Sequence, residues 1–243
     1  MNDSVSIHLA LALTTDEAAG AIRIGGERAA TDRRGALYFA EHRMLVVSDL
    51  HLEKGSSFAR RGQLIPPYDS VATLALLGAV IAQYQPAVVV SLGDSFHDTD
   101  GANRLHPSLR GELEALMAGR DWLWISGNHD PELPADLPGD AVRELAVGTL
   151  RFRHEPTRGA EPGEVAGHLH PCARIVQRGR SVRRRCFACD GERMIMPAFG
   201  AYTGSLNVLD RAYAGLFKRG GLMAYMIGAD RVFAISGSLL RPG

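Results

Sequence analysis

Three short apolar segments, each followed by polar residues, constrain the fold of this chain more than any other feature. They cover residues 44–48, 87–92 and 122–126, and their apolar, β-branched and aromatic composition predicts buried strands. Helical spacing of apolar residues over 67–84 and 107–118 predicts helices that connect these strands in βαβ fashion. Because such strands end at one edge of a sheet, we expect the residues that follow them to meet there.

The ends of these strands, and of two predicted later ones, carry side chains that bind metals well. The candidates are Asp49, His51, Asp94, Asn128, His154, His168 and His170. Oxygen and imidazole donors without a thiolate exclude a Cys-type structural zinc site and favour a catalytic metal centre. Seven donors exceed the needs of one ion but suit two ions about 3.5–4 Å apart, with one carboxylate between them. Asp94, on the central strand, is the natural bridge.

The order of these motifs resembles that of the calcineurin-like metallophosphoesterases. The motifs are Asp-x-His, Gly-Asp, Gly-Asn-His-Asp, a lone His and Gly-His-x-His, and they run from Asp49 to His170. The resemblance implies an α/β fold, a four-layer αββα sandwich with mixed sheets. It also implies hydrolysis of phosphodiester bonds by a metal-bridging hydroxide.

The same resemblance implies a role for each candidate residue. One metal would be held by Asp49, His51, Asp94 and His170. The other would be held by Asp94, Asn128, His154 and His168. His129 would face the scissile phosphate as a proton donor or charge stabiliser. The family often has an acidic residue three positions after the aspartate of Gly-Asp, where this chain has His97 followed by Asp98, so the group that supports His129 stays open here.

Three segments narrow the resemblance. Residues 49–55, 93–98 and 197–204 look like the bacterial metallophosphoesterases associated with a DNA ligase and an exonuclease, the PdeM group. That likeness implies a DNA-repair endonuclease with manganese as the usual metal and the ligase and exonuclease as partners. Iron, zinc and nickel accept the same ligands.

Two alternatives stand beside this hypothesis. One is a phosphatase or pyrophosphatase that acts on nucleotides or other small phosphate esters, since the same metal centre serves these reactions. The other is a metal-bearing binding partner within a DNA repair complex.

Length and composition favour one domain over residues 1–243, with the motifs in about 36–171 and a strand-rich tail over 172–243. The tail would either finish a second sheet or pair across a homodimer axis. Residues 1–35, with the apolar stretch Ile7 to Leu13, carry no motif and are expected to supply an extra edge strand. We expect neither a signal peptide nor a membrane span, and we expect a cytoplasmic protein.

The formal net charge is zero, so bulk charge says nothing about nucleic acid. A local cluster comprises Arg174, Arg178, Arg180, Arg183, Arg184 and Arg185. It would either follow a nucleic-acid backbone or form the solvated face of a hairpin that turns at Gly179. Cys186 and Cys189 are interpreted as two ordinary thiols rather than a zinc or redox pair.

Overall fold

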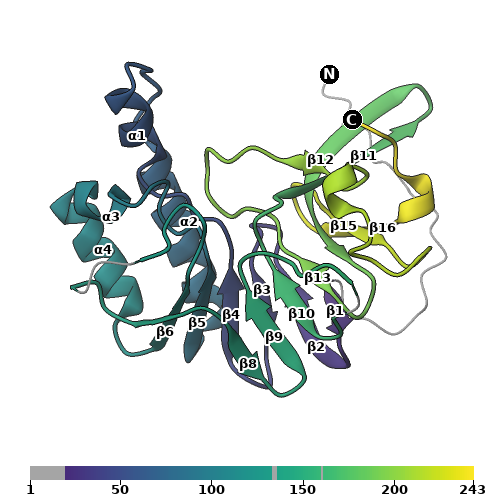
Figure 1. Cartoon of the computed structure of the whole chain (residues 1–243), viewed down its shortest axis with the longest axis horizontal. Helices are drawn as coiled ribbons and strands as arrows, with labels where there is room; N and C mark the ends of the chain where they lie inside the picture. The colour runs from purple at the N-terminus through teal and green to yellow at the C-terminus, as the bar shows by residue number, and fades with distance from the viewer. Residues whose placement is uncertain (1–19, 133–135, 160) are drawn as a thin grey trace, which may run out of the picture.

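The computed structural model describes residues 20–132, 136–159 and 161–243. Two mixed sheets pack face to face (Figure 1). The first sheet contains, in spatial order, β1 (Ala21–Ile24), β2 (Glu27–Thr31), β3 (Leu37–Phe39), β4 (Met44–Val47), β5 (Val88–Leu92), β6 (Asp121–Ile125) and β7 (Asp140–Val142). Neighbours from β1 to β4 are antiparallel, whereas β4 to β7 run parallel.

The second sheet contains, in spatial order, β14 (Leu206–Asn207), β11 (Pro171–Gln177), β12 (Arg180–Cys189), β13 (Met194–Ile195), β10 (Glu164–Ala166), β9 (Leu150–Arg153) and β8 (Leu145–Val147). Beside β12 lie β15 (Met223–Ile227) and then β16 (Val232–Ser236). Strands β9, β10 and β13 run parallel to one another. The strand-rich tail therefore completes the second sheet.

The helices lie on one side of the molecule. They are α1 (Lys54–Arg60), α2 (Asp69–Tyr84), α3 (Gly101–Arg104) and α4 (Pro107–Met117), and α2 and α4 cover the outer face of the first sheet (Figure 1). In the described ranges, the second sheet's own helices are two short 3-10 turns, η1 (Arg211–Tyr213) and η2 (Gly237–Leu239). No described helix is both long and apolar enough to cross a bilayer.

The alternation of side chains in β4 explains why its sequence is apolar at every position. Met44 and Val46 point into the core between the two sheets. Leu45 and Val47 point the other way and pack against the helices. A strand buried on both faces needs a continuous apolar run, and the same reasoning applies to β5.

The predicted strands and helices agree with this architecture, with three differences. Segment 142–147 is divided between two strands, because the chain leaves the first sheet after β7 and enters the second at β8. Helices α1 and α3 were not predicted, since each is too short for a helical period to show. The expected N-terminal edge strand is supplied by β1 and β2, whereas Ile7 to Leu13 lies outside the described residues.

The contact between the two sheets should dominate stability. Phe39 is fully buried, and its ring packs edge-on against Phe152 of the opposite sheet, with centroids 5.8 Å apart. We expect Phe39→Ala to lower the free energy of unfolding by about 3–5 kcal/mol, measured by urea denaturation. Leu64→Ala is the control: its side chain is 89 % exposed, so the change should stay below about 0.5 kcal/mol. Equal effects would contradict this description of the core.

Candidate metal centre

Both sheets contribute loops to one edge of the sandwich. The first supplies the loops after β4, β5 and β6, and the second supplies the loops after β9 and β10. The structure brings together all seven predicted ligands, namely Asp49, His51, Asp94, Asn128, His154, His168 and His170. They form two groups, one around Asp49 and one around Asp94.

Unusual backbone conformations aim these side chains. The φ angle is positive at five of the seven residues, Asp49, His51, Asp94, His168 and His170. Such a conformation costs a non-glycine residue on the order of 1–3 kcal/mol, and it persists where the surroundings enforce it. Part of the enforcement is visible, because the amides of Asp49 and His51 donate to the carbonyl oxygens of Gly93 and Asp94 at 3.2 and 2.9 Å. The strain is concentrated where the side chains converge.

Two glycines allow other loops to lie close to the loop that carries Asp49. A Cβ on Gly167 would overlap the hydroxyl of Ser48, which donates to Asp49 Oδ2, and a Cβ on Gly200 would overlap the carbonyl oxygen of Leu50. The amide of Gly200 also donates to the carbonyl oxygen of Asp49 at 3.1 Å. The tail segment 197–204 is therefore packed directly against the first ligand loop.

The first group comprises Asp49, His51 and His170. The Nε2 atom of His170 lies 3.1 Å from Asp49 Oδ1 and 3.3 Å from His51 Nε2. Burial lowers the pKa of His51 to about 3, against the pull of nearby carboxylates. His51 is therefore a neutral ring with a lone pair available for a metal.

The second group comprises Asp94, Asn128, His154 and His168, and it provides a test of whether a cation fits. His154 Nδ1 lies 3.0 Å from the carbonyl oxygen of Leu92, which assigns a proton to Nδ1. Nε2 then faces Asn128 Oδ1 at 3.0 Å, His168 Nδ1 at 3.2 Å and Asp94 Oδ2 at 3.4 Å. A proton on Nε2 could serve only one of these neighbours, whereas a divalent cation suits all of these donors.

The charges around His154 also indicate that a cation fits the second group. Burial opposes a positive charge on this ring, but the carboxylates of Asp94 and Asp49 outweigh burial and raise the pKa of His154 to about 9. The site therefore attracts positive charge strongly enough to overcome desolvation.

Asp94 contacts both groups. Its Oδ2 atom lies 3.4 Å from His154 Nε2 and 3.9 Å from His51 Nε2, and its Oδ1 atom accepts from the amide of His129 at 2.9 Å. Burial would raise the pKa of Asp94, but His154 and this amide lower it to about 2. An ionised carboxylate therefore stands between the two groups.

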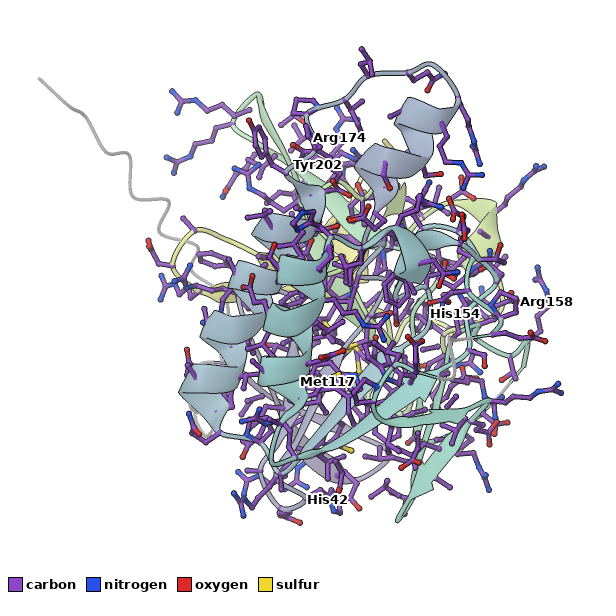
Figure 2. All side chains as sticks on the ribbon, turned by 90° about the vertical axis from the view of Figure 1, so that its left-hand side faces the viewer. His42, Met117, His154, Arg158, Arg174 and Tyr202 are labelled. Carbon is purple, nitrogen blue, oxygen red and sulfur yellow. The ribbon has the colours of Figure 1, made fainter. Side chains whose placement is uncertain are left out.

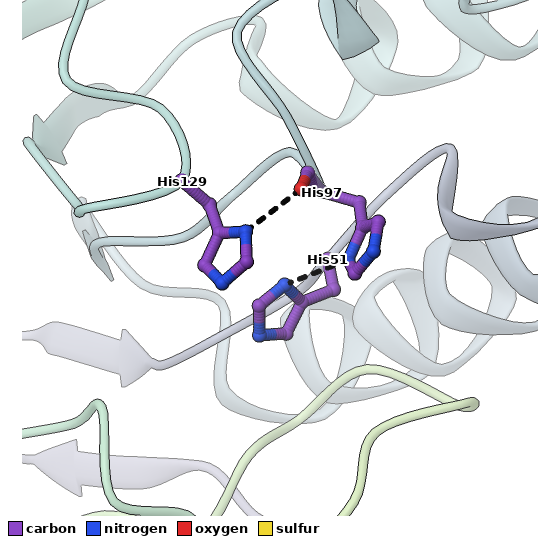
Figure 3. Close-up of side chains that lie close together, drawn as sticks. All are labelled: His51, His97 and His129. Atoms are coloured by element: carbon purple, nitrogen blue, oxygen red, sulfur yellow. Dashed lines mark hydrogen bonds between the residues drawn. The ribbon is translucent and has the colours of Figure 1, made fainter. Parts of the chain in front are cut away.

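His129 lies beside the two groups with an accessible ring. Its Nδ1 atom lies 2.9 Å from the carbonyl oxygen of His97 (Figure 3), which assigns the Nδ1 proton. Its Nε2 atom lies 4.0 Å from Asp94 Oδ2, and the side chain is 41 % exposed. Nε2 is thus the ring nitrogen on the side of the Asp94 carboxylate.

The His129 ring is supported by a backbone carbonyl and not by Asp98. The Asp98 carboxylate accepts two hydrogen bonds from Arg104, both 2.8 Å, and forms no hydrogen bond or ion pair with His129. The backbone carbonyl of His97 holds His129, while the His97 ring stacks on it and approaches His51 Nδ1 at 3.5 Å (Figure 3). The sequence could not reveal this support, because any residue supplies a carbonyl.

Asp130 is a further buried group that the sequence analysis did not single out. It accepts from the amide of Phe96 at 3.0 Å, and burial together with Asp94 raises the pKa of Asp130 to about 7. The sequence could have pointed to Asp130 through its position in the Gly-Asn-His-Asp motif.

A cavity lies next to the second group. It has a volume of about 390 Å³ and is bordered by Asn128, Arg143 and Arg153.

The cysteines take no part in the centre. Cys172, Cys186 and Cys189 are buried free thiols. Cys186 and Cys189 belong to separate cores on opposite faces of β12, so they cannot hold one metal together. The interpretation as ordinary thiols is confirmed.

Phe199 belongs to the tail segment 197–204. Its side chain is fully buried in the core between the first sheet and its helices.

Two donor groups that share a carboxylate and adjoin an exposed imidazole fit a two-metal hydrolase. A family model described as calcineurin-like phosphoesterase matches residues 42–191. The chain belongs to this family and is a metal-dependent phosphoesterase. The predicted fold class is confirmed.

Solved structures give further comparisons. The Pseudomonas putida nuclease MPE is 28% identical with a TM-score of 0.68, over 90% of this chain and 100% of that one. The phosphoesterase Yfce from E. coli is 15% identical with a TM-score of 0.39, over 79% of this chain and 98% of that one, and this weaker likeness supports no argument. A search of curated proteins found no significant match.

The position of Asp94 between the groups generates a prediction about metal content. We expect the wild-type protein to retain two divalent ions per chain after gel filtration, measured by elemental analysis. Asp94→Ala should retain fewer than one, because both groups lose a ligand. Asp98→Ala is the matched control and should retain two, since Arg104 holds that carboxylate away from both groups. Loss of metal in both variants alike would contradict the assignment.

Proposed function

We propose that this chain is a phosphodiesterase that cleaves DNA. The observation that carries the proposal is the placement of His129, an exposed imidazole 4.0 Å from the carboxylate shared by both donor groups. A phosphate held beside Asp94 would place its leaving oxygen within reach of Nε2. Similarity over most of the chain to a structure named as a nuclease supports a polynucleotide substrate.

The chain's own residues would divide the work as follows. Asp49, His51, Asp94 and His170 would hold one ion, and Asp94, Asn128, His154 and His168 the other. The ions, with manganese as our proposed metal, would supply an activated water and neutralise charge on the phosphoryl oxygens. Protonated on both ring nitrogens, His129 would give the Nε2 proton to the leaving oxygen and become a neutral ring that keeps its Nδ1 proton. The carbonyl of His97 would keep the ring oriented, because it accepts the Nδ1 proton.

We also propose a setting for this reaction. The likeness of segments 49–55, 93–98 and 197–204 to ligase-associated phosphoesterases supports a role in DNA repair, with a DNA ligase and an exonuclease as partners. The three free thiols fit a reducing cytoplasm.

Replacement of His129 tests its role as proton donor. We expect His129→Ala to lower kcat on bis-p-nitrophenyl phosphate by about 10²–10⁴-fold while two ions remain bound, because the side chain is outside both donor groups. His42→Ala is the control, since His42 lies at the bottom of the molecule in Figure 2, away from His154 of the second donor group. Full activity of His129→Ala would exclude it as the proton donor.

A comparison of substrates separates the proposed function from its rivals. With added manganese, bis-p-nitrophenyl phosphate and single-stranded DNA should be hydrolysed faster than p-nitrophenyl phosphate, and a chelator should abolish turnover. Preference for the monoester would favour a phosphatase. Absence of turnover on all three would favour a binding partner that merely retains metals.

A further inference from the structure

The β11–β12 hairpin carries a concentration of positive charge that the metal centre does not use. Its arginines are Arg174, Arg178, Arg180, Arg183, Arg184 and Arg185, and the sequence has no acidic residue between Glu164 and Asp190. In the described part of the chain, none of the six forms an ion pair, whereas Arg104 and Arg153 do. The hairpin turns at Arg178 and Gly179, as the sequence predicted.

Three of these arginines line a cavity of about 480 Å³, together with Cys172, Ser205 and Gly228. Arg183 and Arg185 each donate one hydrogen bond to a backbone carbonyl, at Ser205 and Ala198, over 2.8 and 2.6 Å. Burial lowers the pKa of Arg185, and no described carboxylate offsets that burial. Each guanidinium has five N–H donors, so most of the donors in this cavity remain available to an anion.

The cavity lies close to the metal centre without belonging to it. Cys172, opposite Arg185 in the hairpin, is two residues beyond His170, or roughly 7 Å along the strand. Segment 197–205 connects the two places, because Gly200 contacts the Asp49 loop while the carbonyls of Ala198 and Ser205 accept from Arg185 and Arg183. Figure 2 shows Arg174 of the hairpin and Tyr202 of this segment at the same end of the molecule.

We propose that Arg183, Arg184 and Arg185 bind a backbone phosphate of the same DNA strand that is cleaved at the metal centre. The inference rests on the proposed function and adds a second site to it. Arginine forks match phosphate oxygens in paired hydrogen bonds. No metal-ligating residue lines the cavity, so a ligand that engages both places must be a chain with several phosphates. Backbone contacts of this kind position a strand and carry no sequence information.

The test compares a polymer with a small diester on the manganese-loaded enzyme. Arg183→Gln combined with Arg184→Gln removes two charges and leaves Arg185 to hold Ala198. We expect kcat/KM on a 20-nucleotide single-stranded DNA to fall by about tenfold or more, mainly through KM, with a salt dependence shallower by up to about 0.7, the value for one phosphate contact on a single strand. Hydrolysis of bis-p-nitrophenyl phosphate should stay within about twofold, since phosphate contacts affect only substrates long enough to reach them.

Two controls make the result specific. Arg28→Gln combined with Arg219→Gln removes the same charge at exposed positions that form no ion pair within the described residues, and it should leave both activities unchanged. Arg183→Lys combined with Arg184→Lys keeps the charge, and it should restore most of the salt dependence. This pair also serves if the glutamine variant folds poorly.

Each other outcome overturns the proposal. If the glutamine variant cleaves DNA as the exposed-site control does, the cavity is not a strand-binding site. If that variant loses only its inhibition by inorganic phosphate, the cavity binds free phosphate instead of DNA. If the wild type hydrolyses the small diester but not DNA, the inference and the proposed DNA substrate fail, while the proposed phosphodiesterase activity stands. If it hydrolyses neither, the proposed phosphodiesterase activity fails as well.

Discussion

The crowding of lone pairs around His154 Nε2 is the constraint on which the rest of the structure depends. An amide oxygen, a carboxylate oxygen and a second imidazole nitrogen lie 3.0–3.4 Å from this atom, and one proton cannot satisfy them all. Packing donors so closely is unfavourable without a cation. The same protein holds Asp49 and Asp94 almost completely buried and keeps five ligand residues at positive φ. These unfavourable features have a common explanation, because each one places a donor atom where it could bind a divalent ion.

Much of this arrangement could be predicted because local sequence and global topology agree at the first sheet. The apolar runs of β4, β5 and β6 indicate buried strands, the helical periods between them indicate crossovers, and parallel strands must end at one edge. Asp49, Asp94 and Asn128 therefore had to lie near one another. His154 and His170 come from the second sheet, and no period in the sequence shows that this sheet faces the same edge. Their positions after predicted strands made them candidates, and the order of the motifs assigned them to the same site.

What could not be predicted depends on backbone atoms and on competing partners. The support for His129 is a carbonyl oxygen, which side-chain identity cannot disclose. Asp98 was a reasonable candidate for that support until Arg104, six residues later, proved to hold it with two hydrogen bonds. The division of 142–147 between two sheets has a similar origin. Each half is apolar enough for either core, so long-range packing decides which strand each half joins.

Segment 197–205 links the arginine cavity, where we propose that a DNA strand binds, to the metal centre, where the strand would be cleaved. One part of it contacts the Asp49 loop through main-chain hydrogen bonds and the close approach of Gly200. Its two carbonyls at Ala198 and Ser205 accept from arginines of the hairpin. Such contacts limit the distance between the arginine cavity and the donor groups, because one short segment is hydrogen-bonded both to the Asp49 loop and to the hairpin arginines. A strand bound by its phosphates at one place would thus meet the metal centre in a defined position, while a small diester would need only the centre itself.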